Sequence, residues 1–244
     1  MRAPRAVFFD VDFTLIYPGP TFQAEGYQKF CGKHGIAVDP ARFAHAVAEA
    51  SALLVDDEES DLAYDPRMFV EFTKAVIRAM GGEGTRLDQC AWNIYEEWAA
   101  CRHFELYDDV PDVLRQLHAA GVRIGLISNT HRCLETFQHH FELTGLIAAA
   151  ISSSAHGKMK PHPAIFEAAL KEVGVTDPAD AAMVGDSVVH DIEGARRIGM
   201  HGVLVVRAGV PLNVPPDVTV IRSLRELPGI LNVHGVSHPA AEDA

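Results

Sequence analysis

Short apolar runs recur along the chain, and each is followed by a stretch long enough to form a helix. The first run is Ala6–Phe9, which leads directly into acidic residues. Near-continuous apolar runs of this length are typical of strands that are buried on both faces of a parallel sheet. The later runs are Val122–Ile127, Leu146–Ile151, Ala181–Val184 and Val203–Val206. Strands that alternate with helices indicate βαβ units, so the pattern predicts an α/β fold built on a parallel sheet.

Helix-like apolar spacing fills the gaps between several of these runs. The segments Pro111–Ala120, Pro163–Val173 and Val188–Ile198 each end just before a glycine, at positions 121, 174 and 199. Glycine directly after a helix is a common stop signal, because it readily takes a left-handed conformation. These segments are predicted to be helices that cover the sheet.

The alternation stops between Tyr17 and Glu105, where no strand pattern is evident. Amphipathic helical spacing is found there in four segments, which are Thr21–His34, Pro40–Val55, Pro66–Met80 and Arg86–Arg102. The pattern therefore predicts a helical module inserted after the first strand of an α/β core. We assign residues 1–16 and 106–231 to the core, residues 17–105 to a helical cap and residues 232–244 to a polar tail.

The composition narrows the range of functions. The chain has 244 residues, 48% of them hydrophobic, and its 21 Lys+Arg against 33 Asp+Glu give a formal charge of −12. This acidic excess argues against binding to nucleic-acid phosphates. No run of about 18 apolar residues is present, so no membrane helix is expected. The four cysteines include no CxxC pair and are expected to be reduced thiols. We expect a cytoplasmic protein that is a monomer or a homodimer.

Polar residues gather at the carboxyl ends of the predicted strands, where open α/β sheets bind their ligands. They are Asp10, Asp12 and Thr14 after the first strand, Ser128, Asn129 and Thr130 after the second, Lys160 after the third, and Asp186, Ser187 and Asp191 after the fourth. Four carboxylates at one sheet edge would repel one another unless a cation compensates. Mg²⁺ prefers oxygen ligands, and a lysine and a hydroxyl beside it would suit phosphoryl oxygens. The pattern therefore predicts a phosphate group held on Mg²⁺.

In these motifs the sequence resembles the haloacid dehalogenase-like hydrolase superfamily, in subfamily I, whose α-helical C1 cap follows the first motif. The first motif, DxDxT, is Asp10–Thr14, and the second is Ser128-Asn129. The third is Lys160-Pro161, and the fourth, a GDSxxxD pattern, is Gly185–Asp191. All four occur in order over nearly the whole chain. The resemblance implies a Rossmann-like three-layer α/β/α core with an inserted helical cap domain.

The resemblance also implies a role for each matching residue. Asp10 would be the nucleophile that forms an aspartyl-phosphate, and Asp12 would be the general acid and base. Mg²⁺ would be bound by the carboxylates of Asp10 and Asp186 and the backbone carbonyl of Asp12, with Asp191 acting through water or as a partner of the ligands. The substrate phosphate would lie against Ser128, Asn129, Lys160 and Thr14. The implied function is a Mg²⁺-dependent phosphatase of a small phosphorylated metabolite.

Two positions depart from the family's usual pattern. Phe13 stands where glycine is common, and His190 stands where asparagine is common. The turn after Asp12 must therefore accept a bulky side chain, which is expected to face the cap or the leaving group. Candidate contacts to the leaving group are Phe13, Tyr17, Phe22 and Tyr64, whereas Trp92, Tyr95 and Trp98 are expected to pack inside the cap.

Three alternatives stay open. A 2-haloacid dehalogenase shares the nucleophile but typically lacks the second aspartate, so Asp12 argues against it. A phosphomutase retains both aspartates and must shield the aspartyl-phosphate from water, a difference that no cap residue reveals. A non-catalytic phosphate-binding module would usually have lost one of the acidic residues.

Overall fold

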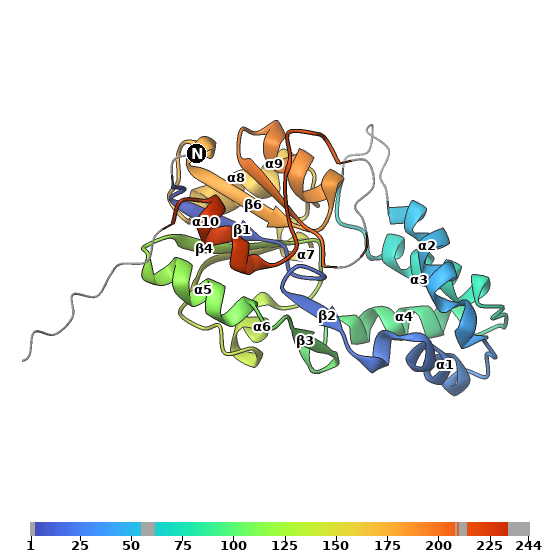
Figure 1. Cartoon of the computed structure of the whole chain (residues 1–244). Coiled ribbons are helices and arrows are strands. Elements are labelled where there is room, and N and C mark those ends of the chain that lie inside the picture. The colour runs from blue at the N-terminus through green and yellow to red at the C-terminus, as the bar shows by residue number, and fades with distance from the viewer. Residues whose placement is uncertain (1–2, 55–61, 208, 210–213, 234–244) are drawn as a thin grey trace, which may run out of the picture.

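The structure is a computed structural model, and it describes residues 3–54, 62–207, 209 and 214–233. A sheet of six parallel strands lies at its centre (Figure 1). The spatial order is β5-β4-β1-β6-β7-β8. The strands are β1 (Ala6–Phe9), β4 (Arg123–Ser128), β5 (Ile147–Ser152), β6 (Ala181–Gly185), β7 (His201–Val205) and β8 (Thr219–Ile221). Numbered along the core alone, this is the 3-2-1-4-5-6 order of the Rossmann fold. The predicted α/β core with a parallel sheet is confirmed.

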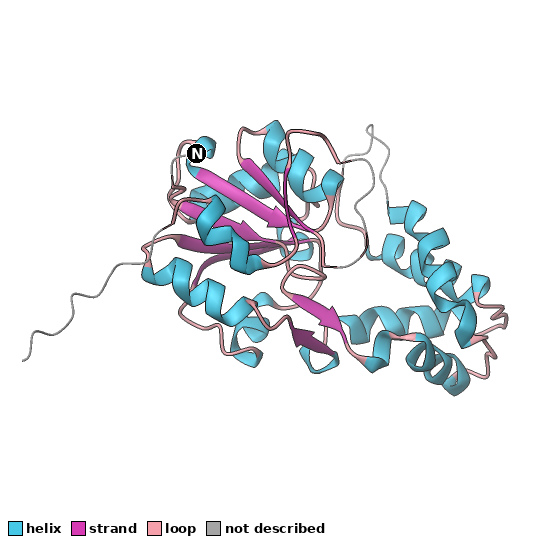
Figure 2. Ribbon diagram, in the orientation of Figure 1, coloured by secondary structure: helices cyan, strands magenta, loops and turns pink. Residues whose placement is uncertain are grey.

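Alternate residues of β1 face opposite sides of the sheet, which explains why this strand is apolar throughout. Val7 and Phe9 belong to one apolar cluster and Ala6 and Phe8 to another, and all four are fully buried. The first cluster includes side chains of α5 (Val110–Ala119), α6 (Leu134–His140) and α10 (Leu227–Ile230), and the second includes side chains of α8 (Pro163–Glu172) and α9 (Gly194–Arg197). The helices therefore form a layer on each face of the sheet (Figure 2).

The helical insertion lies beside the sheet as a separate bundle (Figure 1). Its helices are α1 (Ala24–Lys33), α2 (Phe43–Ala50), α3 (Pro66–Ala79) and α4 (Leu87–Trp98). The chain leaves the core through β2 (Ile16–Pro18) and returns through β3 (Phe104–Leu106), which pair antiparallel. The predicted cap borders at residues 17 and 105 fall on these two strands, and the division into domains stays a prediction.

The longest of these helices, α3, shows how local sequence sets its bounds. The Asp65 carboxylate accepts a hydrogen bond from the backbone N–H of Arg67 at 2.9 Å, which caps the first turn. Pro66 follows, at a position where the missing N–H is not needed. The buried side chains fall at helical spacing, on Val70, Thr73, Val76 and Ile77. This face packs α3 against α2 and α4.

Some local predictions differ from the structure. Strands β2, β3 and β8 have three residues each, which is too short for a recognisable apolar pattern. The expected helix Pro40–Val55 is divided into η2 (Pro40–Arg42), α2 and η3 (Ser51–Leu54), and Val55 lies outside the described residues. The expected helix Val188–Ile198 begins as a π-helical turn, η6 (Val188–Glu193). Further short elements are η1 (Pro20–Phe22), η4 (Cys101–His103), α7 (Ser153–His156), η5 (Pro178–Asp180) and η7 (Leu224–Glu226). Residues 234–244 of the predicted tail also lie outside the described part.

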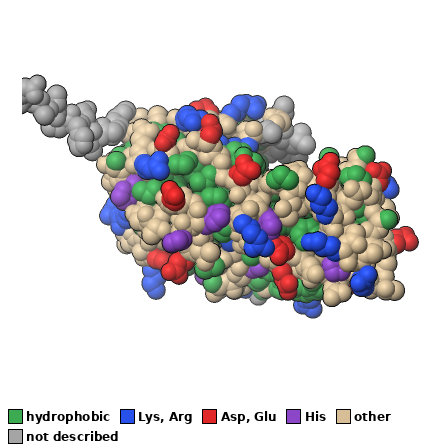
Figure 3. Space-filling model, turned by 90° about the horizontal axis from the view of Figure 1, so that it is seen from below, with side chains coloured by type: hydrophobic (Ala, Val, Ile, Leu, Met, Phe, Trp, Pro, Cys, Tyr) green, Lys and Arg blue, Asp and Glu red, His purple; other side chains and the backbone are tan. Residues whose placement is uncertain are grey.

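The surface carries charges of both signs. On the face drawn in Figure 3, lysine and arginine side chains are interspersed with acidic ones. Phosphate backbones are usually bound by continuous basic stripes, so this face gives no support to nucleic-acid binding.

Among the helices in the described ranges, none has the length and apolar character needed to cross a membrane.

A buried ion pair fastens the loop after β1 to the far end of the core. The Asp109 carboxylate accepts hydrogen bonds from Arg207 Nη1 at 2.6 Å, Ser223 Oγ at 2.7 Å and the backbone N–H of Leu224 at 2.8 Å. Arg207 also donates to the backbone carbonyl of Thr14 at 2.6 Å. Burial acts to raise the pKa of Asp109, but these donors outweigh it and hold the pKa below its ordinary value.

We expect Asp109→Asn to lower the free energy of unfolding at pH 7 by about 3 kcal/mol, because it leaves Arg207 buried without its counter-charge. A carboxyl with a lowered pKa in the folded state stabilises the protein above its unfolded pKa, and this contribution disappears as the pH falls through the folded pKa. The difference between variant and wild type should therefore shrink in acid, measured by urea unfolding at several pH values. Asp112→Asn, at an exposed position on α5, is the control. A difference that is constant with pH would contradict the assignment.

Candidate active site

The predicted site residues meet at the carboxyl edge of the sheet, on either side of β1. Asp10 directly follows β1, Ser128 is the last residue of β4 and Asp186 directly follows β6. Parallel strands bring these ends together, because β4 and β6 are the two neighbours of β1. The chain order reverses at this point in the sheet, which is where Rossmann-like folds bind their ligands.

Lys160 joins the parts of the site. Its Nζ donates to Asp10 Oδ1 at 2.7 Å, to Asp191 Oδ1 at 2.6 Å and to the backbone carbonyl of Ile127 at 2.8 Å. The side chain is only 2% exposed. The Asn129 side chain holds the Lys160 backbone in place, since its Oδ1 accepts from the Lys160 N–H at 2.8 Å and its Nδ2 donates to the carbonyl at 2.9 Å. The lysine is therefore fixed at both of its ends.

The carboxylates of the site are crowded. Burial raises the pKa of Asp10 from its ordinary value of 3.8 to about 7; Lys160 opposes this, and the charges of Asp191 and Asp12 reinforce it. Asp186 is exposed toward the cavity, but its desolvation beside the other carboxylates and the charges of Asp10 and Asp191 raise its pKa well above 3.8. Burial acts to lower the pKa of Lys160, but Asp10 and Asp191 outweigh it and raise this pKa. The cluster thus has more negative charge than one lysine compensates.

This donor set fits a hard divalent cation. One oxygen from each of Asp10, Asp186 and Asp191 lies within 4.8 Å of the others. Carboxylate oxygens are the ligands that Mg²⁺ prefers. Asp191 differs from the other two, because Lys160 occupies its Oδ1 and the backbone N–H of Ser187 donates to its Oδ2 at 3.0 Å. Asp191 is therefore better suited to orient the groups around the metal than to bind the metal directly.

Gly185 makes room for this arrangement. A Cβ atom at Gly185 would lie 2.2 Å from Oδ2 of Asp191, closer than two such atoms can approach. Any other residue here would displace Asp191 and with it the partner of Lys160. The glycine of the fourth motif is thus required by the close approach of the carboxylate.

The loop after β1 carries a predicted phosphate contact, Thr14, that lies away from the other site residues. Thr14 is fully buried and, among the described residues, does not line the cavity described below. The chain turns at Phe13, whose φ is 63°, and the threonine side chain is directed into the protein. Thr14 therefore lies beneath this loop, and its contact with a substrate phosphate stays a prediction. The left-handed φ at position 13 also explains why glycine is common there.

Phe13 itself faces the cap, as expected. The residue is 44% exposed, and the centroid of its ring lies 6.3 Å from that of Trp98 in α4. A phenylalanine with positive φ is strained, and such strain is often found where a side chain serves a site.

Arg132, whose side chain is fully buried between core and cap, is not predicted from the sequence. Its Nη1 donates to Asp12 Oδ1 at 2.8 Å, and its Nη2 donates to the backbone carbonyl of Trp98 at 2.8 Å. The guanidinium also lies over the ring of Phe104 at 4.3 Å from the centroid. A single arginine four residues beyond a strand gives no sequence signal of this kind. Arg132 thus holds the Asp12 carboxylate and the end of a cap helix together.

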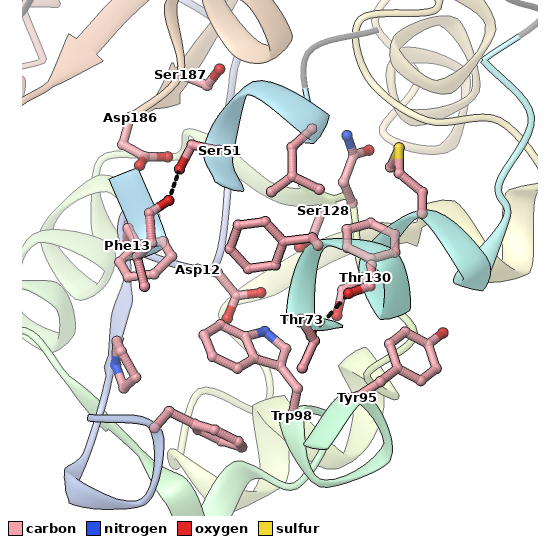
Figure 4. A pocket seen from close by; sticks show the side chains of 18 of the residues that line it. Asp12, Phe13, Ser51, Thr73, Tyr95, Trp98, Ser128, Thr130, Asp186 and Ser187 are labelled. Carbon is pink, nitrogen blue, oxygen red and sulfur yellow. Dashed lines mark hydrogen bonds between the residues drawn. The ribbon is translucent and has the colours of Figure 1, made fainter. Parts of the chain in front are cut away.

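A cavity of about 720 Å³ opens above these residues, between the sheet edge and the helical bundle (Figure 4). Asp10, Ser128, Asn129, Lys160 and Asp186 line its floor, together with Asp12 and Asp191. Of the predicted contacts to a leaving group, Phe13 and Phe22 line it, while Tyr17 and Tyr64 are not among the described lining residues. Tyr95 and Trp98 also line it, and Trp98 packs against the apolar core as expected.

The sequence matches the model of a known protein family. The model for the haloacid dehalogenase-like hydrolases matches residues 4–199. The chain belongs to this family. The haloacid dehalogenase-like fold and a hydrolase activity are therefore established for the chain, with the predicted family membership confirmed.

The chain is also similar to individual proteins of this family. The chain is 30% identical to haloacid dehalogenase-like hydrolase domain-containing protein 3 of Danio rerio, over 95% of this chain and 98% of the relative. It is 31% identical to a phosphoserine phosphatase of Thermus thermophilus, over 63% and 61% of the two chains. Among solved structures, the putative hydrolase YfnB of Bacillus subtilis, bound to magnesium, superimposes with a TM-score of 0.73 at 21% identity, over 96% of this chain and 100% of that chain. At that identity the structural likeness supports the fold of the haloacid dehalogenase-like family alone.

Proposed function

We propose that this hydrolase is a Mg²⁺-dependent phosphatase that cleaves a phosphate monoester of a small metabolite through an aspartyl-phosphate. The observation that carries the proposal is the position of Lys160, which binds the candidate nucleophile Asp10 while Asp186 and Asp191 surround it. The candidate nucleophile, the lysine ammonium group and the oxygens that could bind the metal therefore lie together at one end of a cavity. Positioned positive charge is most of what phosphoryl transfer requires of a protein. A phosphoserine phosphatase among the relatives adds support.

In the first step a carboxylate oxygen of Asp10 attacks phosphorus, the new O–P bond forms and the ester O–P bond breaks. Asp12 gives a proton to the departing oxygen, which leaves as an alcohol. Ser128 and the backbone amides after β4 donate to the phosphoryl oxygens, as does Lys160. In the second step Asp12 takes a proton from a water molecule whose oxygen attacks phosphorus. The acyl phosphate bond then breaks, which releases inorganic phosphate and restores Asp10.

The metal would be held by the carboxylates of Asp10 and Asp186 and by the backbone carbonyl of Asp12. When bound, Mg²⁺ supplies positive charge that offsets the carboxylates and the phosphoryl oxygens. Asp191 orients Lys160 and the Ser187 loop behind these ligands. Burial and the neighbouring carboxylates raise the pKa values of Asp10 and Asp186, and a bound cation would offset this penalty on their ionised forms.

The phosphatase is favoured over the 2-haloacid dehalogenase by Asp12. Displacement of a halide needs no proton for its leaving group, whereas an alkoxide leaving group does. The protein positions Asp12 for such a transfer with a buried arginine, which a dehalogenase would not require. Release of chloride from a 2-chloroacid would contradict the proposal.

The proposal is tested by the metal dependence of hydrolysis of 4-nitrophenyl phosphate. We expect turnover with Mg²⁺ and a loss of at least ~100-fold in EDTA, restored by excess Mg²⁺, because the carboxylate cluster repels an anionic phosphate without the cation. The released nitrophenolate is measured by absorbance. Full activity in EDTA, or no turnover with any divalent cation, would contradict the mechanism. Exchange of phosphate between positions of a sugar phosphate, without release, would point to a mutase.

A further inference from the structure

Among the described residues that line the cavity, the acidic residues and the lysine all lie at its floor. Asp10, Asp12, Lys160, Asp186 and Asp191 come from the core. Among the described residues that the cap contributes to the lining, none is an Asp, Glu, Lys or Arg. The cavity therefore has a charged end, where the phosphate is expected, and an uncharged end beneath the cap helices.

Aromatic rings make up much of the uncharged end. They belong to Phe22, Tyr27, Phe43, Phe69, Phe72, Tyr95 and Trp98. Figure 4 shows Tyr95 and Trp98 beside the same pocket as Asp12 and Ser128. The His131 ring stacks on Tyr95 at a centroid distance of 3.9 Å, and burial together with the charge of Arg132 lowers its pKa, which favours the uncharged imidazole. A ligand that leaves the floor thus meets ring faces and edges.

Polar side chains on the described part of the cap wall have partners within the protein. The Ser51 hydroxyl donates to the carbonyl of Val47 at 2.8 Å, and the Thr73 hydroxyl donates to the carbonyl of Phe69 at 2.9 Å (Figure 4). The Tyr95 hydroxyl pairs with that of Tyr64. Gln23 Nε2 donates to the carbonyl of Pro18 at 3.1 Å. A charged group on a ligand would lose its water at this wall without gaining an ionic partner.

The size of the cavity also bears on the ligand. At about 720 Å³ it is within the range that holds drug-sized molecules, and a phosphate with its cation occupies only the floor. The rest of the cavity is bounded by aromatic rings. A ligand there gains most binding free energy by burying apolar surface.

We propose that the substrates are phosphate monoesters whose leaving alcohol is uncharged and largely apolar, of the size of an aromatic ring or a medium-length alkyl chain. This rests on the proposed phosphatase function and deepens it. The cap would select by excluding carboxylate, ammonium and second phosphate groups, while the core binds the phosphate common to all candidates. Small charged metabolites that carry such groups are poor substrates on this basis.

The test compares purified enzyme with Mg²⁺ on two pairs of primary-alcohol phosphates. Benzyl phosphate and hexyl phosphate represent the apolar class, and 2-phosphoglycolate and O-phosphoserine represent the charged class. We expect kcat/KM to be at least ~100-fold higher for the apolar class, because an unpaired charge is expensive to bury. Equal or higher values for the charged pair would overturn the inference while leaving the phosphatase intact. No release of phosphate from these four or from 4-nitrophenyl phosphate would overturn the proposed function as well.

A substitution in the wall gives a second, independent readout. Met68 in α3 is half-buried and lines the cavity, so Met68→Lys places a cation there with little change in length. Its neutral control is Met68→Gln. We expect Met68→Lys to raise kcat/KM for 2-phosphoglycolate at least ~10-fold over the control and to lower it for hexyl phosphate. Identical values in the two variants would overturn the inference that the uncharged wall excludes the carboxylate.

Discussion

Replacement of Asp10 by asparagine is expected to lower kcat for 4-nitrophenyl phosphate by at least ~10⁴-fold, which corresponds to about 5.4 kcal/mol of activation free energy. The amide has the shape of the carboxylate but lacks the charge and nucleophilicity needed to form the O–P bond. Its oxygen can still accept from Lys160, whose second carboxylate partner, Asp191, is unchanged. The chemical step should therefore be lost without disruption of the site.

The Tm of Asp10→Asn distinguishes loss of the nucleophile from misfolding of the variant. The pKa of Asp10 is raised by burial to about 7, far above its unfolded value, so its ionisation in the folded apoprotein is unfavourable at neutral pH. A carboxyl of this kind stabilises the folded state only at low pH and loses that contribution as the pH rises. Measured in EDTA at pH 8, the Tm of Asp10→Asn should equal or exceed that of the wild type. A lower Tm together with partial activity would contradict both the role and the electrostatics of Asp10.

Arg132→Met is expected to have the second largest effect. The variant retains much of the volume but leaves the Asp12 carboxylate and the Trp98 carbonyl without their donor. We expect the free energy of unfolding to fall by about 3 kcal/mol, as for other broken buried ion pairs. We also expect kcat for benzyl phosphate to fall by about 100-fold, because Asp12 is no longer held toward the leaving oxygen.

A comparison of two substrates shows whether Arg132 positions Asp12 or only stabilises the fold. Benzyl alcohol is a poor leaving group and depends on protonation, whereas 4-nitrophenolate leaves readily without it. Arg132→Met should therefore lose far more activity on benzyl phosphate than on 4-nitrophenyl phosphate, and Asp12→Asn should show the same imbalance. Arg132→Lys keeps the charge but cannot donate to both acceptors in a fixed fork, so it should be intermediate. Equal losses on both substrates would reduce Arg132 to a structural role.

The parts of the molecule that the sequence predicts well are those encoded locally. Ala6–Phe9 is apolar because both faces of β1 are covered, and the acids that follow it stand at the sheet edge because the strand ends there. The order of the motifs then places Lys160 and Asp186 at the same edge. The resemblance to a family adds the roles, since spacing alone does not say which aspartate would be the nucleophile.

The parts that escape prediction depend on contacts between distant segments. Arg132 and Asp12 are separated by 120 residues, so neither side chain signals the other in the sequence. Thr14 belongs to the first motif, yet a turn at Phe13 buries it. Tyr95 and Trp98 have the spacing of packed helix residues, and only the approach of the cap to the core turns one side of them toward a cavity.

The pairing of β2 with β3 has a consequence for how such a protein can change. Tyr17 lies opposite Glu105 and Ile16 lies opposite Leu106, so the chain departs from the core and returns to it at adjacent positions. Paired antiparallel strands are only about 5 Å apart, a distance that a short hairpin turn can span. The cap segment between β2 and β3 therefore joins two points that a hairpin turn could also join. Substrate preference can therefore diversify by exchange, lengthening or shortening of this one segment, while the residues that act on phosphorus keep their places.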